Sequence, residues 1–246
     1  FRDAVNSGID FAGVTVNLKA DITLEGAWKP IGLGSRKNGA GGDKQYAGTA
    51  FKGVFDGNNH TISGLTNIGY DSFVSYFAEK HSTDTFCYGF FGLVDGATIK
   101  NLKMANVNLN TESVTFKKDN TATTAKGDSV GAIVGFCGGS LTMENCSVSG
   151  SVIGYDAVGG LVGRAYDQNG DGKAETISIK GCTNNATVHG AIKVAGIIGY
   201  VGPCAQAASN KDAEVVMISG CVNNGDIKAT ETAKGSYAYG IAGFGF

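Results

Sequence analysis

Val158-Gly159-Gly160-Leu161-Val162-Gly163 decides how this chain folds, because its apolar residues are interrupted by glycines in a pattern that recurs along the sequence. We expect the hexapeptide to form one strand, with alternate residues on opposite faces. Glycine inside a strand costs conformational entropy. Its repeated use therefore indicates a bend, a positive φ, or the close approach of a neighbouring backbone.

Copies of this hexapeptide recur at variable spacing. Two other short recurring stretches, the second and third phrases, accompany them at matching intervals. The copies span 130–135, 194–199 and 239–243, with a looser version at 89–94. A second phrase spans 143–148, 179–184 and 218–223, and 99–102 repeats it with leucine in place of cysteine. A third, short apolar element follows each of these three at 152–153, 188–189 and 227–228.

This arrangement predicts three short strands per repeat, with loops of variable length inserted at the corners. No helical pattern separates the strands. We therefore expect an all-β fold, a single-stranded right-handed parallel β-helix in the form of a three-sided solenoid, with an N-terminal cap. Residues 1–10 are interpreted as the end of a capping helix that stops at Gly8.

The glycine-rich phrase resembles the GLUG motif of bacterial surface proteins. The N-terminal part is similar to the segment that precedes such repeats, in the stretches 4–8, 18–22, 28–32, 51–57 and 60–65. The resemblance implies an adhesin-like protein located outside the cell or on its surface, and it supplies no catalytic residue. It divides one solenoid domain, 1–246, into a cap with the first coil (1–65), an aromatic insert (66–88) and GLUG-type coils (89–246).

Composition narrows the classes of function. Charged residues make up 17% of the 246, and 20 Lys+Arg against 22 Asp+Glu give a net charge of −2. Arginine occurs only at Arg2, Arg36 and Arg164, so a basic face for nucleic acid is not expected. No apolar run approaches the about 20 residues of a transmembrane helix. The start at Phe1 suggests a mature or trimmed chain, either monomeric or part of a longer protein.

Three of the six cysteines, Cys146, Cys182 and Cys221, occupy equivalent places in the second phrase. We interpret them as an interior ladder of small apolar side chains. A disulfide between stacked neighbours is the alternative, although three equivalent positions cannot all pair with one another.

Aromatic residues supply the candidate ligand-binding side chains. They are Tyr70, Phe73, Tyr76 and Phe77 in the insert, together with Trp28. These rings either cover an opening of the coil or form a platform for a glycan or a host surface protein. For Trp28, the alternative to sugar stacking is packing over the N-terminal end.

One segment matches the first half of a calcium loop. Its candidate ligands are Asp167, Asn169, Asp171, the Lys173 carbonyl and Glu175. Ser178 stands where a bidentate glutamate belongs, so a turn rich in Asp and Asn is the alternative. Asp56 and His60 form a second candidate site. We interpret them either as an acid–base pair or as part of a turn that Asp56 and the residues after it favour.

We therefore expect a non-catalytic binding or adhesion module that presents loops on a rigid β-helix. No residue is assigned as catalytic, and calcium is the one cofactor considered. Two alternatives stay open. One is a polysaccharide lyase or hydrolase of the β-helix type, which rests on fold analogy. The other is a structural spacer without a ligand.

Overall fold

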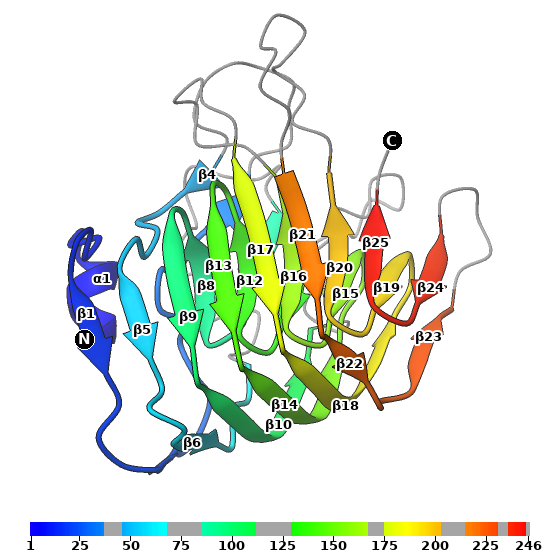
Figure 1. Cartoon of the computed structure of the whole chain (residues 1–246), viewed down its shortest axis with the longest axis horizontal. Coiled ribbons are helices and arrows are strands. Elements are labelled where there is room, and N and C mark those ends of the chain that lie inside the picture. Colours follow the sequence, from blue (N-terminus) through cyan, green and yellow to red (C-terminus); the bar gives the residue numbers. More distant parts are fainter. Residues whose placement is uncertain are drawn as a thin grey trace, which may run out of the picture.

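The computed structural model describes residues 1–36, 46–67, 85–111, 129–166, 175–202, 215–230 and 236–244. Strands dominate these ranges, and the one helix in them is α1 (Arg2–Asn6), which lies at the N-terminal end of the stack beside β1 (Figure 1). The predicted capping helix is therefore present, and Gly8 follows it with φ +116°. No helix among the described residues has the length and apolar character needed to cross a membrane.

The strands form four sheets, which we call A to D, and each sheet runs along the stack. Sheet A contains β1 (Thr15–Asn17), β5 (Val54–Asp56), β9 (Ala97–Lys100), β13 (Leu141–Glu144), β17 (Thr176–Lys180) and β21 (Val215–Ser219). Sheet B contains β2 (Ile22–Thr23), β6 (Thr61–Ser63), β10 (Lys103–Asn110), β14 (Ser147–Ile153), β18 (Thr183–Gly190), β22 (Val222–Asn223) and β23 (Ile227–Ala229). Sheet C contains β24 (Tyr237–Tyr239), β19 (Lys193–Ala195), β15 (Ala157–Gly159), β11 (Ser129–Gly131), β7 (Thr85–Tyr88), β3 (Ser35–Arg36) and β4 (Tyr46–Ala47). Sheet D contains β25 (Ala242–Phe244), β20 (Ile198–Val201), β16 (Val162–Ala165), β12 (Val134–Cys137) and β8 (Phe91–Val94).

The chain visits the sheets in a fixed order, C, D, A, B, and then begins the next coil (Figure 1). Strands of successive coils pair in parallel, as β13 does with β17, where Leu141 faces Ile177. The exception is β3, which is antiparallel to both β4 and β7. The predicted all-β fold of stacked parallel coils is confirmed. The coils β7–β10, β11–β14 and β15–β18, however, each contribute one strand to each of four sheets, where the sequence pattern predicted three strands per coil.

The expectation of one unbroken strand through the hexapeptide is wrong. β15 ends at Gly159 and β16 begins at Val162, so the chain turns a corner between them. Leu161 lies at this corner between the two strands, and both it and Val162 at the start of β16 are fully buried. Their amide N–H groups both donate to the Ile197 carbonyl of the next coil, at 3.1 and 2.9 Å.

The closing glycine of the hexapeptide is required by backbone packing across this corner. A Cβ on Gly163 would lie 2.6 Å from the Gly135 carbonyl oxygen and 2.8 Å from the carbonyl carbon of Ser129, and it would also overlap the Val130 nitrogen. Sheet D therefore approaches sheet C of the preceding coil too closely for any side chain. Of the reasons considered for the glycines, close approach of a neighbouring backbone is the one that holds here.

The cysteine phrase also forms a corner, between sheets A and B. The residue before each cysteine has a left-handed backbone, with φ of 52° at Asn145, 62° at Gly181 and 60° at Gly220. Asparagine and glycine tolerate this region better than other residues do. The corner then directs Cys146 and Cys182 into the core, where at most 1% of each is exposed.

The interior cysteine ladder is thus confirmed for Cys146 and Cys182, while Cys221 in the last coil is only half-buried. All five cysteines in the described ranges are free thiols, so the structure does not adopt the stacked disulfide. The sixth, Cys204, lies outside the described residues. In place of a covalent link, the Cys146 amide donates to the Cys182 sulfur at 3.4 Å.

This ladder predicts an order of thiol reactivity. In the native protein, Cys221 should react with a thiol reagent at least about tenfold faster than Cys146 and Cys182, because a fully buried thiol must wait for local opening. Peptide mapping by mass spectrometry after timed alkylation gives the three rates separately. Equal rates in the native state, or a disulfide linking two of them, would show that the ladder is not built as described.

Candidate functional site

Most of the candidate residues from the sequence lie outside the described ranges. These are Tyr70, Phe73, Tyr76 and Phe77 of the aromatic insert, and Asp167, Asn169, Asp171 and Lys173 of the calcium-like loop. The structure places the two remaining candidates, Trp28 and Glu175, and it brings them to different parts of the molecule.

Trp28 is held in the N-terminal coil by contacts on its ring and on its N–H group. The indole stacks on Phe90, with ring centroids 5.0 Å apart and planes 10° apart, and Nε1 donates to the Phe90 carbonyl at 3.0 Å. The Arg2 guanidinium carbon lies 4.9 Å from the ring centroid. These contacts support a packing role for Trp28 at this end of the stack.

Glu175 is a buried carboxylate tied to the neighbouring coil. The Ser140 hydroxyl donates to its Oε2 atom and accepts a hydrogen bond from the Thr176 amide at 2.9 Å. Among the described residues, no three His, Cys, Asp or Glu side chains are grouped so that they could hold a metal ion. Glu175 therefore has a structural partner of its own, and calcium binding remains a prediction.

Asp56 and His60 have separate partners, so the structure does not join them as an acid–base pair. Asp56 Oδ1 accepts from the Asn58 amide at 2.9 Å and from Asn101 Nδ2 at 3.0 Å, whereas His60 Nδ1 lies 3.2 Å from Asp21. Burial acts to raise the pKa of Asp56, but the hydrogen bonds from Asn101, Asn58 and Lys100 outweigh it and hold the pKa below its usual value. Of the two interpretations of this segment, a turn stabilised by the Asp56 side chain is the one that these contacts support.

The lowered pKa of Asp56 predicts a pH dependence of stability. Because the pKa is lower in the folded protein, the ionised carboxylate stabilises the fold above the ordinary value of 3.8, and this contribution is lost as the pH falls through the folded pKa. We expect the loss, less than about 1 kcal/mol, between about pH 5 and pH 3. Urea unfolding across this range should show a smaller loss in Asp56→Asn than in the unmodified chain, and equal losses would refute the assignment.

A second group of side chains, separate from the main core, packs where sheets C and D meet. We call it the C–D cluster. Its apolar end contains Tyr46, Ala50, Cys87, Leu93 and Phe136, with Tyr166 packed against them. The Tyr46 hydroxyl donates to the buried carboxylate of Asp95 at 2.9 Å, and Lys52 Nζ lies 2.8 Å from the same oxygen.

The middle of the C–D cluster is charged. Asp156 lies between two cations: Arg164 Nη2 is 2.5 Å from Oδ2, and Lys193 Nζ is 2.7 Å from Oδ1. Arg164 Nε also donates to the Ser129 hydroxyl at 3.2 Å. Arg164 and Asp156 are 6% and 8% exposed, so these charges are stabilised mainly by one another.

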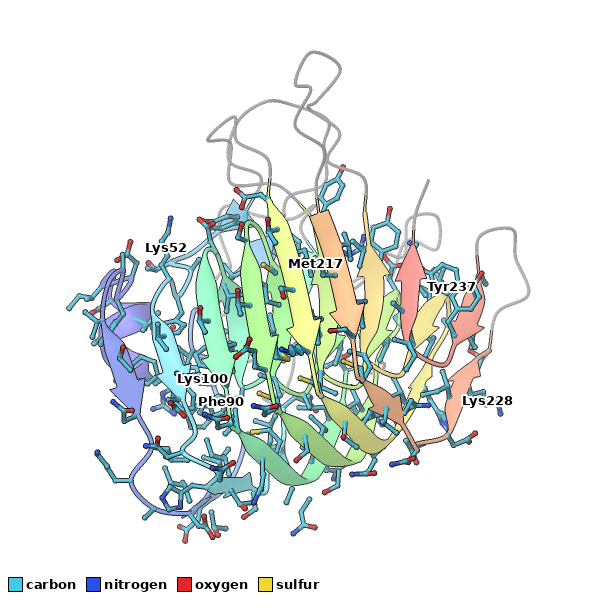
Figure 2. The ribbon with its side chains drawn as sticks, in the orientation of Figure 1. Lys52, Phe90, Lys100, Met217, Lys228 and Tyr237 are labelled. Carbon is cyan, nitrogen blue, oxygen red and sulfur yellow. The ribbon has the colours of Figure 1, made fainter. Side chains whose placement is uncertain are left out.

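The C-terminal end of the cluster is aromatic. Arg164 Cζ and Lys193 Nζ lie 4.7 and 5.2 Å from the centroid of the Tyr200 ring. Tyr237 and Tyr239 follow on β24, with centroids 4.8 Å apart and planes 30° apart, and Figure 2 shows Tyr237 at this end of the stack. Burial raises the pKa of Tyr237, and its protonated hydroxyl donates to the Gly199 carbonyl at 3.1 Å.

Tyr239 is 51% exposed, which makes it one of the few large side chains with an apolar ring that the structure presents to solvent among the described residues. The sequence pattern does not point to this end of the cluster, although residues of equivalent place flank successive copies of the hexapeptide. Arg164 and Tyr200 are register partners in sheet D, and Lys193 and Tyr237 are register partners in sheet C. Aligning the repeats by register would have drawn attention to them.

The fold and these contacts define a β-solenoid with a charged and aromatic cluster on one side. A search with protein-family models finds no match to the chain. The chain is 30% identical over 151 residues to halomucin of Haloquadratum walsbyi, an alignment that covers 61% of this chain and 1% of halomucin. It therefore spans a very small part of that relative.

A solved structure shows the same fold. It is the crystal structure from Bacteroides ovatus described as that of "a putative immunoglobulin A1 protease". The TM-score is 0.53 at 24% identity, over 89% of this chain and 52% of that one. At this identity the likeness concerns the fold alone, and the chain spans about half of the solved one.

Proposed function

We propose that the chain is part of a cell-surface or secreted protein and acts there as a non-catalytic, adhesin-like module that binds carbohydrate. The observation that carries the proposal is the stacked pair Tyr237 and Tyr239, of which Tyr239 is half open to solvent, beside the charged middle of the C–D cluster. Aromatic rings held rigidly at a surface offer apolar area to the faces of sugar rings at little entropic cost. The similarity to halomucin supports the surface setting.

The same proposal covers the finer architecture. We take the hexapeptide repeats to be of the GLUG type and the coil to be a right-handed, three-sided β-helix, in which the short strands of sheets C and D together make one side. Connections between parallel strands of one sheet are right-handed in nearly all proteins, which supports the hand. The backbone packing at Gly163 supports treating β15 and β16 as one folded side.

The absence of catalysis is also part of the proposal. The three buried carboxylates of the described residues lie against separate partners: Asp95 with Tyr46 and Lys52, Asp156 with Arg164 and Lys193, and Glu175 with Ser140. Glycoside hydrolysis needs two carboxylates that flank one bond, with the acid kept ready to give up a proton. Because each of these carboxylates is held by its own separate partners, the contacts support a structural role for Asp95, Asp156 and Glu175.

A glycan array tests the proposal. The unmodified chain should bind a subset of glycans, and Tyr239→Ser should weaken that binding by about tenfold, since stacking of one ring contributes about 1 kcal/mol or more. Met217→Ser is the matched control, because Met217 is 50% exposed on sheet A of the last coil (Figure 2). Loss of binding in both variants, or in neither, would reject Tyr239 as part of the site.

A further inference from the structure

We infer that the carbohydrate bound by the C–D cluster is acidic, carrying a carboxylate that Lys193 recognises. This inference rests on the proposed function and specifies its ligand. It starts from the charges of the cluster: two cations, Arg164 and Lys193, share the single carboxylate of Asp156. Among these three residues one positive charge is left in excess, on a chain whose net charge is −2.

The two cations differ in how accessible they are. The Arg164 side chain is 7% exposed and is occupied by Asp156 and Ser129. The Lys193 side chain is 25% exposed, and its ammonium group carries three donors, of which Asp156 takes one at 2.7 Å. Of the two cations beside Asp156, Lys193 is therefore the one that can reach an anion from solvent.

Lys193 also stands beside the aromatic pair. It is the register partner of Tyr237 on the adjacent strand of sheet C, so their backbones are about 4.8 Å apart. A pyranose ring stacked on Tyr239 or Tyr237 would place a carboxylate substituent one strand away, within reach of a lysine side chain. A neutral sugar would make the stacking contact but would offer the lysine no charged partner in addition to Asp156.

Calorimetric titration with tetragalacturonate and with its fully methyl-esterified form tests the inference, because the ester keeps the sugar rings and removes the charge. The unmodified chain should bind the acid about tenfold more tightly than the ester, as expected for one charge-assisted hydrogen bond. Lys193→Gln should remove this preference without weakening ester binding, and Lys193→Arg should retain it. Lys228→Gln is the control, since Lys228 is an exposed lysine in the same end of the stack (Figure 2).

The outcomes separate the two proposals. Equal binding of acid and ester by the unmodified chain overturns the acidic ligand and leaves carbohydrate binding in place. Binding of neither probe, with binding of an acidic peptide instead, overturns both. If Lys193→Gln does not fold, the salt dependence of the unmodified chain decides, because the preference for the acid should shrink strongly towards about 1 M salt. A preference that is insensitive to salt contradicts the role of Lys193.

Discussion

A chain with alanine in place of Gly163 is expected to unfold at a much lower urea concentration than the unmodified chain. The added methyl group would lie among the Gly135 carbonyl and the backbone of Ser129 and Val130, none of which can rotate out of the way. Relief requires sheets C and D to separate at this coil. We expect the free energy of unfolding to fall by about 3 kcal/mol or more.

Gly240→Ala is the matched control for this experiment. Gly240 belongs to the last copy of the same hexapeptide, and a Cβ built on it meets no atom within 4 Å. Its replacement should change the free energy of unfolding by no more than about 0.5 kcal/mol. Similar losses in the two variants would mean that close backbone approach is not the reason for the closing glycine.

The second large effect is expected at Asp156. Replacing it by asparagine leaves the Arg164 guanidinium, which is 7% exposed, without its carboxylate, and removing one partner of a buried ion pair costs about 3 kcal/mol. Thermal or urea unfolding of Asp156→Asn measures the loss. Asp226→Asn makes the same chemical change at an exposed position beside His189 and should leave the unfolding midpoint unchanged. A loss no greater than that of the control would show that the charges of the cluster are solvated.

The sequence pattern was sufficient for the stacked parallel coils, because Val158 and its equivalents recur with glycines at places that only a repeating β-structure explains. It was not sufficient for the corners. A glycine-rich strand and a glycine-rich bend have the same local composition, so the break after Gly159 could not be distinguished from continuation. The cysteine phrase was ambiguous for the same reason. Asn145 turns the chain with a left-handed backbone, but the sequence alone does not distinguish it from an asparagine within a strand.

The candidate site was less predictable because it depends on register between coils. Lys193 and Tyr237 are adjacent in sheet C although a coil of chain separates them, and their pairing depends on the lengths of the intervening corners. Single residues were also ambiguous: Trp28 carries the ring typical of a sugar site, yet its contacts with Phe90 and Arg2 are those of packing. Lone aromatics in a sequence do not reveal which face is covered.

Nuclear magnetic resonance titration with tetragalacturonate tests the central claim most directly, because it locates the ligand on the protein. Trp28 is the sole tryptophan, so its indole N–H gives a single resonance that reports on the N-terminal coil. The account predicts saturable shifts of the amide signals of Lys193, Tyr200, Tyr237 and Tyr239, with the Trp28 indole signal unmoved. Shifts of the Trp28 indole signal without shifts in β19, β20 and β24 would contradict it.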